Sequence, residues 1–304
     1  MESWDRTSVD GLLAGFDEHL RRTRGVCAGT RRNYAKFVRA FLGRVSDHGV
    51  DVSEIAPAQV IEYVGEVTRA YRPRTVEGAA TSLRSFFRFL RAEGLREDRL
   101  EDAVPMVPHR PSGLVRHLEP RRFEQLIASL DSASPRGLRD RAIILCMARL
   151  GLRTGEVVQL RLEDIDWVNA TVRVRARKTG HGALLPLPDD VGVTLAEYLQ
   201  QARPDTQARE VFVLHRLRVG APISGSIVGR AVDNALRRAA MTAPMRGGNL
   251  LRHSLASELV CRGASLREIA DLFGHSSLAT TRIYAAVDVA ALREVALPWP
   301  EATS

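Results

Sequence analysis

Cysteine is scarce in this chain of 304 residues, and the scarcity limits what the protein can be. The three cysteines, Cys27, Cys146 and Cys261, are odd in number, lie far apart and form no CxxC pair. This pattern argues against a disulfide framework and offers no zinc-ligand spacing. We therefore expect reduced thiols that pack as small apolar groups.

Long apolar runs are missing as well. No stretch of the sequence approaches the roughly 18 consecutive apolar residues that a membrane-spanning helix needs. The first residues, Met-Glu-Ser-Trp-Asp, show no basic segment followed by an apolar one, which a secretory signal would contain. We expect a cytoplasmic protein with no membrane partner.

Lysine is the third scarcity, because only Lys36 and Lys178 among the 44 Lys and Arg residues are lysine. The basic residues still outnumber the acidic ones and give a formal net charge of +8 at pH 7. Such a balance favours an anionic partner such as nucleic acid. In a chain that uses arginine almost everywhere, a lysine at position 178 is a candidate for chemistry that arginine cannot perform.

The apolar pattern predicts a helical domain over residues 1–104. Apolar residues recur at helical spacing in four segments, and four helices with short connections indicate a small bundle. Ser8 and Thr75 are the expected caps of the first and fourth helices, Pro57 suits the first turn of the third, and Gly94 should end the fourth. Closely spaced prolines make residues 105–117 an extended linker.

Residues 118–286 are predicted to be mostly helical with one small β-hairpin, so the fold class is mainly α with a small sheet (α+β). Strict alternation over residues 171–177 places valines on one face of a strand and arginines on the other. Lys178 opens the turn that follows, and residues 183–187 form the returning strand. Helices are expected over residues 119–130, 135–151, 155–160 after a Thr154 cap, 189–201, 224–240, 250–262 and 265–274, with a last helix that carries Tyr284.

Four short segments hold the polar residues that a phosphoryl-transfer site needs. They are Gly151-Leu152-Arg153-Thr154-Gly155-Glu156, the hairpin turn at Lys178, Asn249-Leu250-Leu251-Arg252-His253, and Gly274-His275 with Tyr284 nine residues after the histidine. No segment is specific alone. Together, in this order and at these intervals, they resemble the active-site boxes of the tyrosine recombinases, or phage-type integrases, and the resemblance spans nearly the whole chain.

Two arginines are the candidates for holding a phosphate. Guanidinium groups clamp non-bridging oxygens with paired, directional hydrogen bonds, and Arg153 and Arg252 are the residues that match the family pattern. Glu156 lies three residues after Arg153, where it either orients that arginine or a histidine or simply favours the helix dipole as an N-terminal carboxylate. A lone arginine in such a place is more often surface charge, and the matching boxes reverse that judgement.

The remaining roles come from the resemblance. It implies that Tyr284 is the nucleophile, that Lys178 protonates the leaving 5′ oxygen and that His275 donates a hydrogen bond to the phosphate. A lysine suits proton donation because an ammonium can lose its proton where a guanidinium scarcely can. Asn249 departs from the family's usual histidine: an amide can donate to a phosphate but cannot transfer protons, and it also suits a helix N-cap. His253 matches a histidine often found in the third box.

Arginines outside the boxes are candidates for DNA contact. For any one of them a solvated surface is an equal alternative. Those in the first domain gather at the first helix–helix connection and along the fourth helix, and two more lie on the predicted strand. The set is Arg22, Arg31, Arg32, Arg72, Arg74, Arg84, Arg88, Arg173 and Arg175.

The sequence therefore predicts a site-specific DNA recombinase, integrase-like or transposon-encoded, that acts on double-stranded DNA. The resemblance implies a core-binding domain at 1–104, a catalytic domain at 118–286 and four protomers around two duplexes. It also implies a tail at 287–304 exchanged between neighbours; packing of this tail on its own domain is the alternative. No metal or cofactor is expected, and no Gly-rich phosphate loop is present. The rival functions are a tyrosine-type topoisomerase and a non-catalytic DNA-binding protein of the same fold.

Overall fold

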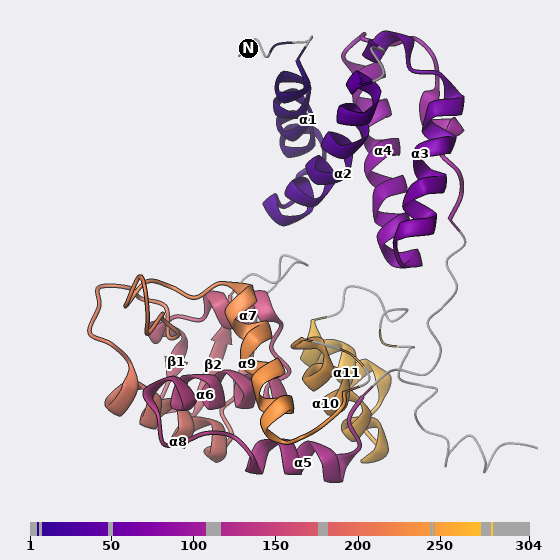
Figure 1. Cartoon of the computed structure of the whole chain (residues 1–304). Coiled ribbons are helices and arrows are strands. Elements are labelled where there is room, and N and C mark those ends of the chain that lie inside the picture. The colour runs from indigo at the N-terminus through magenta and orange to yellow at the C-terminus, as the bar shows by residue number, and fades with distance from the viewer. Residues whose placement is uncertain are drawn as a thin grey trace, which may run out of the picture. The chain divides into compact units, whose positions relative to one another are not determined.

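The computed structural model describes residues 5, 8–47, 51–107, 117–175, 182–243, 245, 247–274 and 281. Its contacts divide the chain into two compact units, Met1–Pro111 and Ser112–Ser304, which are drawn in Figure 1. Within these described ranges, no helix combines the length and the apolar character that crossing a membrane would require.

The N-terminal unit is a helical bundle, as predicted. α2 packs against α1 and α4, and α3 packs against α4. Buried phenylalanines fill the space between them, with Phe16 and Phe86 edge to face at 5.4 Å between ring centroids. The helices are α1 (Val9–Arg24), α2 (Ala28–Asp47), α3 (Pro57–Ala70) and α4 (Pro73–Ala92), with 3-10 turns at Val52–Glu54 and Leu100–Ala103.

Three of the four predicted helix boundaries in this unit are confirmed, and one is wrong. The Ser8 hydroxyl accepts a hydrogen bond from the Gly11 backbone N–H at 3.1 Å, and Pro57 opens α3. Gly94, with φ of 70°, follows the end of α4. The expected Thr75 cap is wrong, because α4 already begins at Pro73. Proline has its φ fixed near the helical value and needs no partner for an N–H, so it starts the helix three residues earlier, with Arg72 as the cap residue.

The C-terminal unit is built around α6, which contacts helices on several sides. Residues 142–148 of α6 are all buried, as expected of a helix that is apolar on nearly all sides. Ser134 caps this helix by accepting from the Gly137 N–H at 2.9 Å. The helices are α5 (Pro120–Ala128), α6 (Pro135–Arg149), α7 (Thr154–Gln159), α8 (Asp189–Glu197), α9 (Gly225–Arg238), α10 (Asn249–Cys261) and α11 (Leu266–Phe273), with a 3-10 turn at Leu162–Asp164 and a π-helical turn at Tyr198–Ala202.

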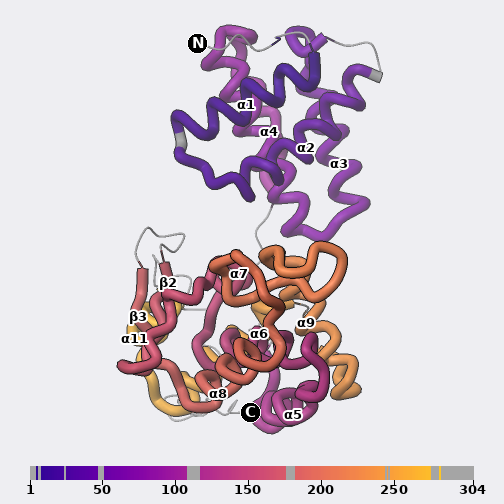
Figure 2. The backbone as a smooth tube through the Cα atoms, turned by 90° about the vertical axis from the view of Figure 1, so that its left-hand side faces the viewer, coloured from indigo at the N-terminus to yellow at the C-terminus, as the bar shows by residue number. Residues whose placement is uncertain are grey.

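A small antiparallel sheet lies at one edge of this unit, where Figure 2 shows β2 and β3. Its strands are β1 (Ile165–Asp166), β2 (Thr171–Val174) and β3 (Ala183–Pro186), in the order β1-β2-β3. Val172 pairs with Leu185 and both are buried, while Arg173 faces solvent, so the predicted alternation is confirmed over the described strand. β1 was not predicted, because two residues are too few to show a period.

Candidate active site

Three segments that are distant in the sequence meet at the C-terminal end of α11. One Arg252 nitrogen, Nη1, donates to the Gly151 carbonyl, and the other, Nη2, donates to the Phe273 carbonyl at 2.7 Å. Arg153 Nη2 donates to the Gly274 carbonyl at 3.4 Å. The two arginines predicted to clamp a phosphate therefore donate to neighbouring carbonyls, those of Phe273 and Gly274, which directly precede His275 in the sequence.

Arg252 is held in a buried setting that suits a guanidinium. The residue is only 5% exposed, and its guanidinium carbon lies 3.9 Å from the centroid of the Phe273 ring. A buried cation is costly unless it is paired or hydrogen-bonded, and here carbonyl oxygens and the negative face of an aromatic ring supply the compensation. Phe273 is itself fully buried, so the stack fixes the plane of the guanidinium.

Arg153 is the more accessible of the pair, with a side chain that is 32% exposed. Its Nη1 donates to Glu156 Oε1 at 2.8 Å, and its backbone N–H donates to Glu156 Oε2 at 2.9 Å. Glu156 therefore does two things: it stabilises the first turn of α7 and it orients Arg153. Both roles that the sequence left open, a helix N-terminal carboxylate and a residue that orients Arg153, apply. Because this carboxylate caps the helix, Arg153 takes the cap position, and the expected Thr154 cap is wrong.

Gly151 sits at the point where these contacts converge. Its φ is 64°, a left-handed conformation that favours glycine. A Cβ at this position would lie 2.6 Å from Phe273 Cε1, closer than real Cβ contacts come. The backbone of residue 151 therefore approaches the Phe273 ring closely while its carbonyl accepts from Arg252.

Asn249 does not cap α10, which corrects the expectation from the sequence. The cap position belongs to Gly248, and Asn249 is the first helical residue, with an exposed side chain. Gly248 is packed so closely against α6 that any Cβ would collide with the Met147 side chain. The helix therefore starts one residue earlier than expected, with its cap residue packed against α6. Asn249 remains a candidate for hydrogen bonding to a phosphate.

His253 follows Arg252 on α10 and is partly buried. Burial lowers the pKa of this histidine, and the positive charges of Arg252 and then His117 lower it further. The neutral imidazole is therefore favoured, which suits a residue that supports its neighbour rather than one that holds an anion.

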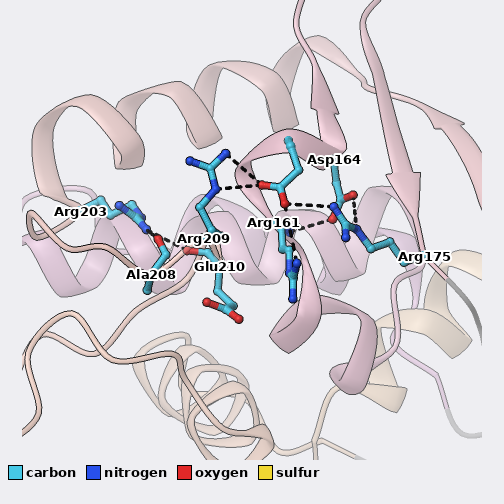
Figure 3. Close-up of polar contacts among 8 residues, drawn as sticks. Arg161, Asp164, Arg175, Arg203, Ala208, Arg209 and Glu210 are labelled. Atoms are coloured by element: carbon cyan, nitrogen blue, oxygen red, sulfur yellow. Dashed lines mark hydrogen bonds and ion pairs between the residues drawn. The ribbon is translucent and has the colours of Figure 1, made fainter.

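Lys178, His275 and Tyr284 lie outside the described residues, so their predicted roles stay predictions. The strand that leads to Lys178 is described as far as Arg175, and Figure 3 shows its anchor. Arg175 Nε donates to Asp164 Oδ1 at 2.6 Å, and Arg175 Nη2 donates to Glu163 Oε1 at 3.1 Å.

Asp164 is the buried centre of this anchor. Its side chain is 2% exposed, and its second oxygen accepts from the Arg161 backbone N–H at 3.0 Å. The Asp164 carboxylate raises the pKa of Arg175, as expected for a cation held in an ion pair. Arg175 was predicted as a DNA contact. Its hydrogen bonds instead go to Asp164 and Glu163 and fix the base of the hairpin. Sequence reasoning missed Asp164, whose only sign was its place near a strand.

The other arginines proposed for DNA contact fall into two groups. Arg22 pairs with Glu18, Arg31 binds Asp17 at 2.8 Å, and Arg84 donates to the Val104 and Pro105 carbonyls at 3.1 and 2.8 Å. Arg31 and Arg84 thus link separate segments of the N-terminal unit, whereas the Arg22 pair is exposed and lies within α1. The side chains of the second group are exposed and make no ion pair or hydrogen bond within the described ranges; its members are Arg32, Arg72, Arg74 and Arg88. Arg173 on β2 is exposed as well.

Within the described part of the chain, no three His, Cys, Asp or Glu side chains are grouped as a metal site would require. The described side chains that could donate hydrogen bonds to an anion are the two guanidinium groups and the exposed amide of Asn249.

The chain belongs to the phage integrase family. The family model matches residues 116–290, and the model of the N-terminal SAM-like domain of phage integrases matches residues 13–94. The chain is 40% identical over 301 residues to the putative integrase/recombinase y4rA of Sinorhizobium fredii, covering 97% of this chain and 72% of the relative. It is 32% identical over 307 residues to the tyrosine recombinase XerD of Mycobacterium tuberculosis strain H37Rv, covering 93% and 95%.

Solved structures share the same fold at lower identity. The XerH site-specific recombinase bound to a palindromic difH substrate in a post-cleavage complex superposes with a TM-score of 0.75 at 20% identity, over 94% of this chain and 83% of that one. A lambda integrase dimer bound to a COC′ core site gives a TM-score of 0.68 at 18% identity, over 97% and 99%. These likenesses confirm the predicted fold class: a helical N-terminal domain and a mainly helical C-terminal domain with a small sheet.

Proposed function

We propose that this protein is a site-specific DNA recombinase that cuts and rejoins strands through a 3′-phosphotyrosyl intermediate on Tyr284. The observation that carries the proposal is the convergence of Arg153 and Arg252 on the backbone at Phe273 and Gly274, immediately before His275. An arginine with only a structural role needs no second guanidinium beside it. The negative charge on a phosphate in the transition state of strand transfer is stabilised by both guanidinium groups. Membership of the integrase family supports the same function.

In the proposed reaction, the Tyr284 oxygen attacks the phosphorus and the 5′ oxygen leaves as Lys178 gives it a proton. A phenol has a pKa of about 10, so it must lose its proton to attack, and nearby cations favour that loss. Arg153, Arg252, His275 and Asn249 donate hydrogen bonds to the non-bridging oxygens. The 5′ hydroxyl of a partner strand then attacks the phosphotyrosine, releases Tyr284 and restores a phosphodiester. The bond energy is conserved, so no nucleotide is consumed.

The substitution Tyr284→Phe tests the nucleophile. It removes only the phenolic oxygen, so covalent protein–DNA adducts should vanish while DNA affinity stays nearly unchanged. The target sequence is identified by sequencing the DNA that crosslinks to the protein in cells. Duplexes of that sequence, nicked near the cleavage position, serve as substrate. A denaturing gel detects the adduct. An adduct that persists in the Phe variant would show that another residue is the nucleophile, and a wild type that binds DNA without forming any adduct would favour a non-catalytic binding protein.

Assembly on DNA is the second part of the proposal. The relatives in solved structures include a dimer bound to DNA, and we propose that this chain forms a tetramer on two duplexes, with residues 287–304 exchanged between protomers. The apolar residues of that tail are too few to fold alone and need a partner surface. Truncation after Asp288 should keep binding to a single half-site and lower cooperative assembly in a gel-shift titration. Loss of single-site binding would instead mean that the tail packs on its own domain.

A further inference from the structure

A basic pocket in the C-terminal unit takes no part in the site described above. It has a volume of about 490 Å³ and lies where the N-terminal ends of α6 and α9 face the loop before α9. Five arginines and a histidine are among the residues that line it, and they are Arg136, Arg139, His215, Arg216, Arg218 and Arg230.

The positive charge of this pocket is poorly neutralised. Arg139 is buried and donates to Asp140 Oδ1 at 2.7 Å, and Arg136 lies 3.8 Å from the same carboxylate. One acidic side chain thus serves two arginines. The side chains of Arg216, Arg218 and Arg230 are exposed and make no ion pair or hydrogen bond among the residues described. Arginines held this close repel one another, and a bound anion would lower that repulsion.

His215 adds an unused polar atom. Its Nε2 is buried and has no hydrogen-bond partner in the described part of the chain, although buried polar atoms are nearly always paired. Burial lowers the pKa of His215, and the Arg139 charge lowers it further, so the ring is neutral at pH 7. A neutral imidazole can donate one hydrogen bond from Nε2 without adding to the charge that already crowds the pocket.

The pocket borders the candidate active site. Ser224 lines it and immediately precedes α9. The next residue, Gly225, has its Cβ position 3.1 Å from Thr154 Cγ2, and Thr154 follows Arg153. The start of α9, which forms one side of the pocket, therefore lies next to the start of α7, whose cap residue is Arg153.

We infer that this pocket binds a backbone phosphate of the DNA next to the one that is cleaved, with Arg216 and Arg218 as its main donors. The inference rests on the proposed function for the identity of the anion. Leu217, between the two arginines, has φ of 65° and a fully exposed side chain. That conformation costs a non-glycine residue roughly 1–2 kcal/mol. It keeps the arginines at the tip of the loop, where a strand can reach them.

The double variant Arg216→Gln/Arg218→Gln tests the inference, because both side chains are exposed and their removal should leave folding intact. Binding of a short labelled duplex of random sequence is measured by fluorescence anisotropy across a salt series. The slope of log K against log salt should become shallower by about 0.9 for each phosphate that the variant no longer neutralises. Affinity at fixed salt should fall roughly tenfold, as expected when a charge-assisted hydrogen bond is removed.

Arg121→Gln is the matched control. Arg121 is an exposed arginine on α5, at the far end of the same unit from α7 in Figures 1 and 2, and it has no ion pair or hydrogen bond within the described ranges. Its substitution also removes an exposed guanidinium, but Arg121 does not line the pocket. The slope of log K against log salt should therefore stay at the wild-type value. Equal slopes for the double variant and the control would overturn the inference.

Two further measurements separate the possible outcomes. Isothermal calorimetry with inorganic phosphate and no DNA asks whether the pocket holds a free anion; phosphate binding that the double variant loses, combined with an unchanged DNA slope, would overturn the DNA assignment. Adduct formation on a nicked duplex at saturating protein should persist in the double variant. If the wild type forms no adduct while the salt slopes still differ, the proposed recombinase reaction fails and the phosphate pocket stands.

Discussion

Replacing Gly151 by alanine should damage both the stability of the C-terminal unit and the strand-cleavage reaction. The reason is the close approach of this residue to Phe273. An added Cβ would lie 2.6 Å from Phe273 Cε1 and 3.2 Å from Leu255 Cδ2, and both neighbours belong to packed helices. The Phe273 ring cannot turn away, because it is completely buried and stacked on the Arg252 guanidinium.

Two costs add at this position. A left-handed φ costs a residue with a Cβ roughly 1–2 kcal/mol. Forcing an extra methyl group into a packed core costs a further 1–3 kcal/mol or so. The free energy of unfolding of the C-terminal unit should therefore fall by about 2–5 kcal/mol. Gly263→Ala isolates the first cost, since Gly263 has φ of 87° and nothing within 4 Å of its Cβ position.

Differential scanning calorimetry of the full chain measures the effect. A unit of this size loses roughly 2–4 °C of melting temperature for each kcal/mol, so the Gly151 variant should melt clearly below the Gly263 variant. Only the transition of the C-terminal unit should move. Adduct formation should slow more than DNA binding weakens, because Phe273 carries both Arg252 and the backbone before His275. If both alanine variants melt together, the contact with Phe273 does not restrict position 151, and the reasoning fails.

The remaining predictions concern the hairpin and the thiols. Arg175→Gln should slow cleavage by up to about 10²-fold, because the anchor to Asp164 fixes the strand that leads to Lys178. A substrate with 5′-bridging sulfur, whose thiolate leaves without a proton, should restore most of that rate, while Arg173→Gln on the same strand should need no rescue. A variant equally slow on the sulfur substrate would refute a positioning role. Of the three thiols, the two exposed ones should react with a disulfide reagent in the native protein. Burial raises the pKa of Cys146 to about 12, so it should react only after unfolding, and fast native labelling of all three would contradict this.

The helix starts show how far local chemistry reaches. Ser8 was predicted as a cap from the residues beside it, and the hydroxyls of Ser8, Ser134 and Ser265 each accept a backbone N–H three residues ahead. These contacts close within one turn, so the sequence around them contains all that decides them. The failures at Thr75 and Thr154 are also local: Pro73 and Glu156 begin those helices earlier, and both signals stood in the sequence.

The start of α10 could not be predicted in this way. Asn249 is the better cap by local preference, yet Gly248 takes the position and packs against Met147, about a hundred residues earlier in the chain. The anchor of Arg175 on Asp164 has the same character. An alternating strand with arginines on its open face gives no sign that one of them is paired beneath the hairpin. Contacts between distant segments decide both cases, and a single sequence does not reveal them.

Arg252 is both a candidate phosphate ligand and a structural link between distant segments, because the same properties of the guanidinium suit both roles. Its planar fork bridges the Gly151 and Phe273 carbonyls while its face lies on the Phe273 ring. A lysine has a single ammonium, which could provide neither the stacking nor the two-sided geometry. A decrease in activity on changing Arg252 would therefore mix the removal of a phosphate ligand with a displaced α11. The Gly151→Ala variant should displace α11 without removing either guanidinium group, so comparing it with an Arg252 variant shows how much of the lost activity comes from the displaced helix.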